Sequence, residues 1–568
     1  MAAYVLLLNL GRERPINGEM AAFSATPPLA LAAGTIVTSD YLPWARVLAN
    51  SFAAHHRGVR FAVLILDQAG DALRRADDGF ELLFPEDVGL DSDEYGWMRA
   101  IYDGFELSCA VKPWLLRHLL EDAAAAFYFD SDILICSPLD DIARRAAAAG
   151  LLLTPHTFEP PPPDGLIPDE DTFLRLGQFN AGFIAVGAQG RRFLDWWGER
   201  LRRHCVAWSP SEPLRFVDQR WLDLAVNYFS LDVLRDPGAN VAYWNLWTRP
   251  IAHGPGGYLV DGEPLRFMHF SGFDPANPDR LSRHLGDPPR IDATRSAALQ
   301  QLCAEYAASL AGAGLRLGSG RRAVGELAPG IWLTTPVRAA VRAALLEAER
   351  LGTIHLPDPT DHCAVHSWLR SPVTAGGISW YLWGLWASHP GIRSAFAAVP
   401  GPDEQRLLAW SEREGAALEL VPTGLAGRAL RLDLDGARSF VALVDGDELA
   451  NDCTLLAGIA ECFNSASDVT LLIHAPGRSG DALERQLEPL LTRFGLDGPA
   501  SPDLLGMVTP AAPGALAPLV HAVLTHHRRA DPALRAIPHV TDAAALRRLV
   551  EISAPARETE QPRPRRAA

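Results

Sequence analysis

The sequence predicts an α/β protein in which a doubly wound sheet is followed by a helical module and a second α/β unit. Three observations predict this class. Short apolar runs typical of buried parallel strands alternate with helical segments up to about residue 270. One of these runs, residues 123–129, ends directly at the acidic pair of Asp130-Ser131-Asp132. The alternation then resumes after Ser439.

In the first half, strands and helices follow one another, which favours parallel strands joined by crossover helices. Strands are predicted at residues 34–38, 60–66, 123–129, 151–154, 183–186 and 265–270. Helices are predicted at residues 41–55, 108–120, 191–204 and 217–228, and from Leu139. A loop containing Pro160 to Pro163 cannot be regular, so we expect it to lie over one face.

The second half has a different texture. Residues 290–310 are predicted to be helical, and the glycine-rich stretch 312–330 is predicted to be a linker. Residues 331–425 are expected to form a helical module, and 426–553 a Rossmann-like unit without a visible phosphate-binding loop. Within that unit, strands are predicted at 440–444, 469–473 and 504–508, and helices at 481–494 and 516–526. Residues 554–568 are polar, basic and proline-containing, which predicts a disordered tail.

The composition excludes some classes of protein. The 568 residues allow about two to four domains, and a hydrophobic fraction of 48% is enough to fill their cores. The formal charge of −16 argues against a nucleic-acid binder, because such proteins usually present a basic face. It does not exclude phosphate ligands, since a bound cation reverses the local charge.

The chain has the features of a cytoplasmic protein. Seven cysteines are scattered and form no Cys-x-x-Cys pair, so we expect reduced thiols. Residues 2–10 are apolar but lack the positive segment and the clear cleavage site of a signal peptide. No apolar run is long enough for a transmembrane helix.

The acidic pair is the first candidate for chemistry. Ligands of open α/β sheets bind at the carboxyl ends of the strands, which is where Asp130 and Asp132 follow their strand. Carboxylate oxygens suit Mg²⁺ or Mn²⁺, ions that are often shared with the phosphates of a substrate. The alternative is that both residues cap a turn or begin the helix near Leu139.

Six ordered segments carry a resemblance to glycosyltransferase family 8 over roughly residues 30–285. They are Thr38-Ser39-Asp40-Tyr41, Ala110-Val111-Lys112, Asp130-Ser131-Asp132, Phe179-Asn180-Ala181-Gly182, Asp218-Gln219 and His269-Phe270-Ser271-Gly272. The resemblance implies a GT-A fold over residues 1–290, a nucleotide-sugar donor that is usually UDP-linked, and dependence on Mn²⁺ or Mg²⁺. It also implies transfer of a hexose with retention of configuration to a glycan, lipid or protein acceptor.

The resemblance implies a role for each matching residue. Asp130, Asp132 and His269 would hold the metal, although His269 could instead be a core histidine bonded to backbone. Asp218 and Gln219 would lie beside the anomeric carbon, and Asp218 could instead merely start a helix. The donor-binding residues would be Thr38, Asp40, Lys112, Ser131, Asn180, Ala181 and Gly272.

Three of the donor residues have simpler alternatives. Lys112 stands where the family usually has arginine and could reach the phosphates, or it could be a solvated helix lysine. Asp40 could be a helix N-cap rather than a contact of the base. Asn180 could belong to an ordinary turn before a strand.

One departure concerns the donor. Family members commonly carry a lysine soon after the His-x-x-Gly motif, where this chain has Phe273-Asp274-Pro275. Either another cation, such as Lys112, Arg220 or Arg280, replaces it, or the donor pocket is altered. The alternative function is therefore a non-catalytic nucleotide-sugar-binding or scaffold protein. A nucleotidyltransferase is disfavoured because no glycine-rich basic loop follows the first strand. We expect the C-terminal half to be structural or partner-binding, with self-association as one option.

Overall fold

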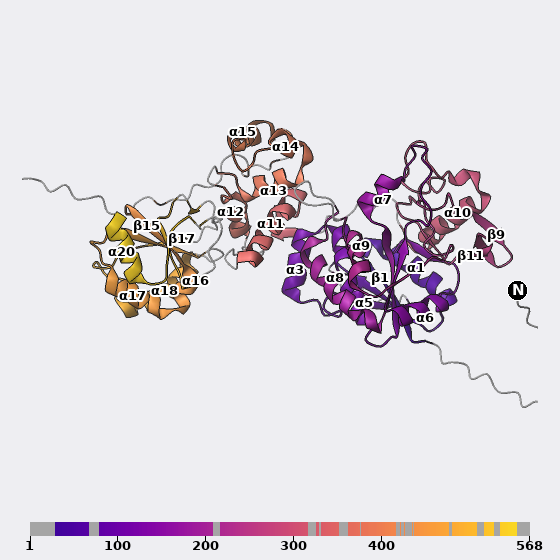
Figure 1. Cartoon of the computed structure of the whole chain (residues 1–568), viewed down its shortest axis with the longest axis horizontal. Helices are drawn as coiled ribbons and strands as arrows, with labels where there is room; N and C mark the ends of the chain where they lie inside the picture. The colour runs from indigo at the N-terminus through magenta and orange to yellow at the C-terminus, as the bar shows by residue number, and fades with distance from the viewer. Residues whose placement is uncertain are drawn as a thin grey trace, which may run out of the picture.

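The computed structural model describes residues 29–553 apart from 68–78, 208–215, 316–324, 329–330, 352–361, 375–376, 476–479 and most of 416–436, 508–518 and 527–535. The described residues form an N-terminal α/β unit, a helical module and a C-terminal α/β unit (Figure 1). The predicted tail at 554–568 lies outside the described residues.

The N-terminal unit is built on a seven-stranded sheet with the order β3-β2-β1-β4-β7-β6-β8. Its strands are β1 Leu31–Val37, β2 Arg60–Ile65, β3 Glu81–Leu83, β4 Ala125–Phe129, β6 Leu151–Pro155, β7 Phe179–Gly187 and β8 Asp232–Val233. The first four run parallel, but β7 is antiparallel to both β4 and β6. The connection from β6 to β7 holds only one short helix and re-enters the sheet at the edge it left, so β7 runs backwards. The prediction of parallel strands is therefore wrong for β7.

Helices cover both faces of this sheet. On one face, α1 (Leu42–His55) and α6 (Asp140–Ala149) enclose an apolar core. A second core on the other face lies under α3 (Ser92–Ile101), α4 (Gly104–Ala110), α5 (Lys112–Leu119), α8 (Arg191–His204) and α9 (Gln219–Tyr228). The single helix predicted over 108–120 is broken at Val111, because Pro113 has no N–H to continue the hydrogen-bond ladder.

Smaller elements surround the carboxyl edge of the sheet. β5 (Ile133–Ile135) pairs with β12 (Phe267–His269), while β9 (Ile251–Gly254), β10 (Gly257–Val260) and β11 (Glu263–Pro264) form a separate ribbon. α7 (Glu170–Leu176) lies between β6 and β7. The helix expected over 290–310 is α10 (Ala297–Gly312), which starts at the Ser296 cap. Its Tyr306 stacks on Phe270 with 3.9 Å between ring centroids, so residues beyond the proposed boundary at 290 pack against the end of β12.

The helical module consists of α11 (Thr335–Leu351), α12 (His362–Arg370), α13 (Trp380–Ser388), α14 (Pro390–Ala395) and α15 (Glu404–Trp410), preceded by β13 (Glu326–Ala328) and β14 (Ile331–Trp332). Its apolar residues continue the core under α3 and α8. Arg338 Nη1 donates to Arg99 O at 2.6 Å, and Arg342 Nε donates to Arg203 O at 3.1 Å. The module is therefore packed against the N-terminal unit. The linker predicted at 312–330 falls largely outside the described residues.

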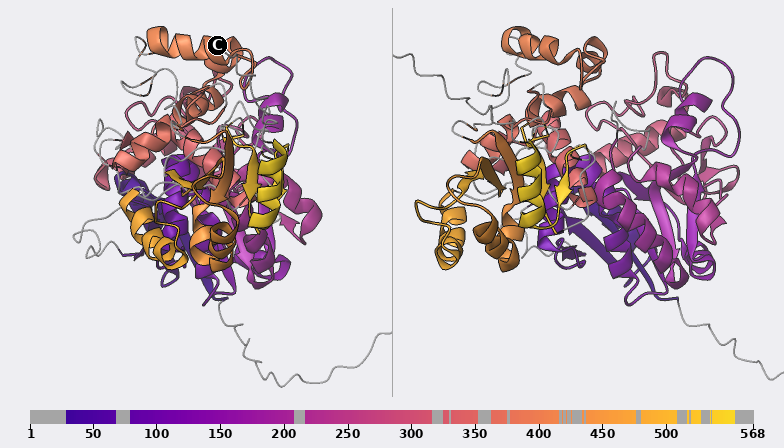
Figure 2. Two further views of the ribbon diagram at one scale, coloured as in Figure 1. Left: turned by 90° about the vertical axis from the view of Figure 1, so that its left-hand side faces the viewer. Right: turned by 60° about the vertical axis from the view of Figure 1, so that its left-hand side comes forward.

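The C-terminal unit has a five-stranded parallel sheet with the order β17-β16-β15-β18-β19. Its elements are β15 Phe440–Asp445, α16 Gly446–Asn451, α17 Cys453–Cys462, β16 Val469–His474, α18 Gly480–Phe494, β17 Asp503–Met507, β18 Ala522–Leu524, β19 His539–Val540 and α20 Ala543–Ser553. The helix predicted over 516–526 is wrong, since Ala522–Leu524 is a buried strand beside β15. Figure 1 shows this sheet apart from that of the N-terminal unit, Figure 2 shows the orange and yellow helices beside it, and it has its own cores.

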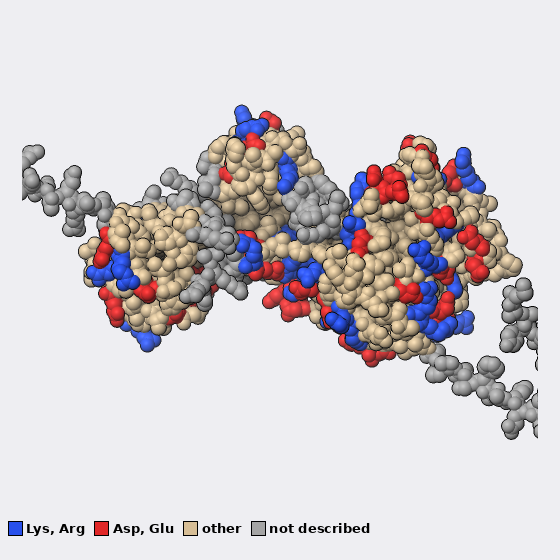
Figure 3. Space-filling view, viewed as in Figure 1, with Lys and Arg blue, Asp and Glu red and all other residues tan. Residues whose placement is uncertain are grey.

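The described surface and helices add two observations. Basic and acidic residues are interspersed over the face of the N-terminal unit in Figure 3, so this face carries no continuous basic area. Among the described residues, every helix falls short of the combined length and apolar character that a bilayer span requires.

Glu106 makes the stability of the N-terminal unit depend on pH. Its carboxylate accepts hydrogen bonds from Ala207 N at 2.9 Å and Asp103 N at 3.2 Å, and burial raises its pKa from 4.5 to about 7. A raised carboxyl pKa favours the folded state below the unfolded pKa, and this contribution is lost as pH rises from about 4.5 to 7. Relative to Glu106→Gln, the wild-type chain should therefore lose about 1 to 3 kcal/mol between pH 5 and pH 8.

Chemical denaturation of both proteins at several pH values checks this. Glu263→Gln, at an exposed glutamate in β11, is the matched control and should follow the wild-type curve. Parallel curves for wild type and Glu106→Gln would contradict the assignment.

Candidate metal centre and donor site

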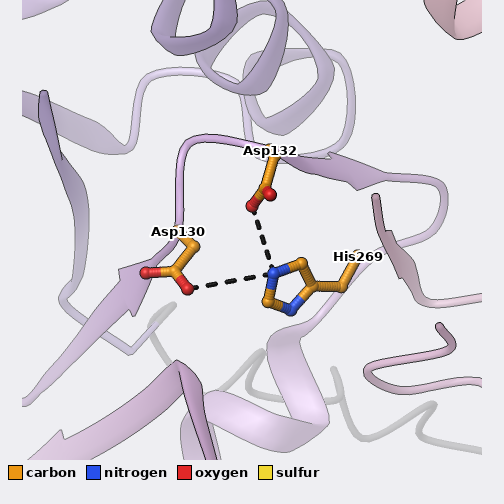
Figure 4. A group of neighbouring side chains, drawn as sticks. All are labelled: Asp130, Asp132 and His269. Carbon is orange, nitrogen blue, oxygen red and sulfur yellow. Dashed lines mark ion pairs between the residues drawn. The ribbon is translucent and has the colours of Figure 1, made fainter. Parts of the chain in front are cut away.

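Asp130, Asp132 and His269 are brought together by the pairing of two short strands. Asp130 follows β4, Asp132 precedes β5, and the pairing of β5 with β12 sets His269 opposite Ile133. His269 Nε2 lies 3.1 Å from Asp132 Oδ1 and 3.8 Å from Asp130 Oδ2 (Figure 4). One ligand atom from each residue lies within 4.8 Å of the others. The carboxylates are 34% and 30% exposed, whereas His269 is 4% exposed, so the centre is reached from the carboxylate side.

Asn240 orients the imidazole of His269. The Nδ1 atom lies 3.3 Å from Asn240 Oδ1, and the amide of Asn240 donates to Asn180 Oδ1 at 3.1 Å. If Nδ1 donates to Asn240, the lone pair of Nε2 faces the two carboxylates, which is the arrangement that a metal-binding histidine needs. Burial opposes the imidazolium form, but the Asp132 carboxylate raises the pKa of His269. Two carboxylate oxygens and one imidazole nitrogen suit Mn²⁺ or Mg²⁺.

Gly182 in β7 allows this close approach. A Cβ atom at this position would lie 2.3 Å from His269 Cε1 and 2.8 Å from Asp130 Oδ2. The nearest contact is with a ring held by Asn240, so a side chain at residue 182 would displace the ring or the strand. The glycine in the Asn-Ala-Gly motif therefore has a steric reason in this structure.

Lys112 is the only lysine in the sequence, and its ammonium is buried. Nζ lies 2.8 Å from Asp218 Oδ2 and 3.4 Å from Asp130 Oδ1, and it donates to Ala181 O at 3.1 Å. Burial favours the neutral amine, but the carboxylates of Asp130 and Asp218 raise the pKa of Lys112 well above its usual value. The alternative of a solvated helix lysine is wrong. Contact with phosphates stays a prediction, and it would require Nζ to leave these oxygens.

Asp218 and Gln219 lie beside the same backbone. Asp218 is 1% exposed and precedes α9, but its carboxylate accepts no capping hydrogen bond from the backbone of that helix. Gln219 Oε1 accepts from Ala181 N at 3.0 Å and Asn180 Nδ2 at 3.2 Å, and its Nε2 donates to Leu176 O at 2.9 Å. Gln219 thus joins α9 to β7, whereas the side chain of Asp218 pairs with Lys112 of α5. Their roles at the anomeric carbon stay predictions.

The remaining donor candidates lie outside this network. Thr38 follows β1, and its hydroxyl donates to Asp40 Oδ1 at 2.5 Å. Asp40 is exposed and makes no backbone cap in the described structure, which removes the N-cap alternative. Ser131 lies between the two aspartates. Gly272 turns the chain three residues after His269 with a φ of 72°. Since β1 neighbours β4, Thr38 and the acidic pair share the carboxyl edge of the sheet.

Two residues of the centre were missed in the sequence. Tyr128 donates its hydroxyl to Asp130 Oδ1 at 2.7 Å, which occupies the side of that carboxylate facing away from His269. Asn240 has a φ of 54°, a conformation that asparagine tolerates better than most residues. Tyr128 could have been suspected from its place two residues before Asp130 on one strand face. Nothing in the sequence links Asn240 to His269.

Two curated proteins are similar in sequence to less than half of this chain. No protein-family profile matches the chain. It is 25% identical to the uncharacterized protein YfnD of Bacillus subtilis over 245 residues, covering 42% of this chain and 76% of YfnD. It is also 28% identical to the uncharacterized protein YfnF of the same species over 202 residues, covering 34% of this chain and 61% of YfnF.

Among solved structures, the galactosyltransferase LgtC in complex with donor and acceptor sugar analogs has a TM-score of 0.30 and 17% identity. That match covers 49% of this chain and 95% of LgtC. The glycosyltransferase GlyE of Streptococcus pneumoniae has a TM-score of 0.29 and 11% identity, covering 92% of this chain and 97% of GlyE.

The buried charge of Lys112 should dominate the stability of the N-terminal unit. Lys112→Met leaves Asp218 buried without a counter-charge, which is expected to cost about 3 to 5 kcal/mol in the free energy of unfolding. The double variant Lys112→Met, Asp218→Asn should recover most of this loss, because it removes both charges. Denaturant unfolding of Lys112→Met, Asp218→Asn and the double variant measures the coupling. Additive costs would contradict the ion pair.

Proposed function

We propose that this chain is a metal-dependent glycosyltransferase that moves a hexose from a nucleotide sugar, most often UDP-linked, to a glycan, lipid or protein acceptor with retention. The observation that carries the proposal is the grouping of Asp130, Asp132 and His269 at the carboxyl edge of the sheet. Ligands of open α/β sheets bind at that edge. The resemblance to glycosyltransferase family 8 and the glycosyltransferases among similar structures support the same reading.

The side chains present fit a divalent cation. Asp132 and His269 Nε2 would bind Mn²⁺ or Mg²⁺ together with Asp130 Oδ2, because Asp130 Oδ1 already accepts from Tyr128. Asn240 would keep the imidazole in the binding tautomer. A bound cation would supply Lewis-acid stabilisation of the charge on a departing diphosphate.

The other proposed site residues are divided between two ends of the same edge. Thr38 and Asp40, at the exit of β1, would contact the nucleotide. Asn180 and Ala181, joined to Gln219, would contact the sugar near the metal. For Asp218 to act on the anomeric carbon, its carboxylate would have to exchange Lys112 for the sugar, since the two are 2.8 Å apart.

A binding screen followed by a turnover assay tests the proposal. UDP, GDP, ADP and their sugar conjugates are each added with and without Mn²⁺, and the unfolding temperature is recorded. Stabilisation that requires metal is expected for one nucleotide. The matching nucleotide sugar should then be hydrolysed slowly without acceptor, and NMR of the released sugar should first show the anomer of the donor.

A non-catalytic nucleotide-sugar-binding protein is the second candidate. It is favoured by Phe273-Asp274-Pro275 standing where the family commonly has a lysine, and by the engagement of Asp218 with Lys112. Metal-dependent binding without any hydrolysis would select it over the transferase. An absence of metal-dependent binding to every nucleotide would overturn both.

Removal of Asp132 should strongly weaken metal binding and leave the fold intact. Loss of a residue that only supports a metal ligand costs about 10- to 100-fold in affinity, so Asp132→Ala should weaken Mn²⁺ binding by at least about 100-fold. Titration calorimetry with Mn²⁺, together with the unfolding temperature, measures both effects. Asp122→Ala, at an exposed aspartate before the opposite end of β4, is the matched control. Unchanged Mn²⁺ affinity in Asp132→Ala would sink the metal assignment.

A further inference from the structure

The chain folds back on the metal centre just after His269. It turns at Gly272 and returns so that Arg283 N donates to Gly272 O at 2.9 Å. Ser282 Oγ donates to Ser271 O at 2.7 Å, and His284 N donates to Ser282 Oγ at 3.1 Å. Residues 282–284 therefore lie alongside residues 271–272, close to a proposed metal ligand.

The imidazole of His284 fills the space that a side chain at residue 272 would need. A Cβ atom on Gly272 would lie 2.4 Å from His284 Cδ2 and 2.7 Å from His284 Nε2. The ring also packs at 5.8 Å from Tyr243, which packs on Trp244, and Trp244 meets the ring of His269 edge-on at 5.0 Å. These contacts connect His284 to His269 through the rings of Tyr243 and Trp244. Partial desolvation of the ring and the neighbouring Arg283 lower the pKa of His284, whereas the Asp132 carboxylate acts to raise it, so His284 and Asp132 lie within electrostatic reach of each other.

His284 is exposed, in contrast to the ammonium of Lys112 on the other side of the centre. Lys112 is buried and already contacts Asp130, Asp218 and Ala181. The three carboxylates of Asp130, Asp218 and Asp132 and the one ammonium of Lys112 have a net charge of about −2. A divalent cation would balance this charge. The charge of a diphosphate bound to that cation would then need further hydrogen-bond donors from the open side of the centre.

We infer that His284 is a binding residue for the diphosphate of the donor, donating a ring N–H to a phosphate oxygen beside the metal. This inference rests on the proposed function and gives the diphosphate a contact that comes from the returning segment rather than from Lys112. It also gives Gly272 a purpose, because any side chain there would collide with the ring of His284.

Titration calorimetry with UDP in the presence of Mn²⁺ tests the inference on the full chain. His284→Ala should bind UDP about tenfold more weakly, because a charge-assisted hydrogen bond is lost, while its affinity for Mn²⁺ alone stays that of the wild type. His284→Lys should keep UDP affinity within about threefold, since an ammonium also donates to phosphate. His253→Ala, at an exposed histidine of β9, is the matched control and should bind as the wild type does.

The outcomes distinguish a failure of the role of His284 from a failure of the proposed function. Wild-type affinity for UDP in His284→Ala, with normal metal-dependent binding in the wild type, would overturn the role of His284 and leave the proposed function standing. A tenfold loss of UDP affinity in Arg283→Ala, with no loss in His284→Ala, would assign the phosphate contact to Arg283. That result would also overturn the role of His284. No metal-dependent UDP binding by the wild type would overturn both the inference and the UDP-linked donor.

Discussion

The candidate site depends on one buried positive charge. Lys112 holds its ammonium within reach of Asp218, Asp130 and the carbonyl of Ala181, and an unpaired charge at this depth would not be tolerated. Its partners come from α9, from the end of β4 and from β7, so satisfying this charge fixes three elements relative to α5. All the remaining Lys and Arg residues of the chain are arginines. A compact ammonium with three donors fits these converging oxygens better than a planar guanidinium fork.

The two carboxylate oxygens of Asp130 have different partners. One oxygen accepts from Tyr128 and faces Lys112, while the other faces His269. A carboxylate held in this way keeps its second oxygen at a fixed place before any cation arrives, so less ordering remains to be done on binding. The Asn240 contact does the same for His269. The candidate metal centre is therefore an extension of the core and is not carried by a free loop.

The sequence was most informative where strand pattern and chemistry coincide. An apolar run ends at Phe129 and acids follow it, so β4 was expected to end there, at the carboxyl edge of the sheet. The strand does end at Phe129 in the structure. Two features of the fold were not predicted from the sequence, because they depend on long-range packing. The reversal of β7 follows from where its connection re-enters the sheet, and the strand at Ala522–Leu524 is too short for its periodicity to differ from that of a helix. The burial of Lys112 escaped for a related reason, since its partners lie 18 and 106 positions away along the chain.

The support of the site extends past the region that resembles a glycosyltransferase. Tyr306 of α10 stacks on Phe270, the residue next to His269, and thereby restrains the end of β12. On the opposite face of the sheet, Glu94 pairs with Arg203, whose Nε also contacts Glu349 of α11 at 2.7 Å. The core around α5 is continuous with that of the helical module. The helical module thus completes an apolar core that begins in the N-terminal unit, and this shared core gives it a structural reason to be packed there.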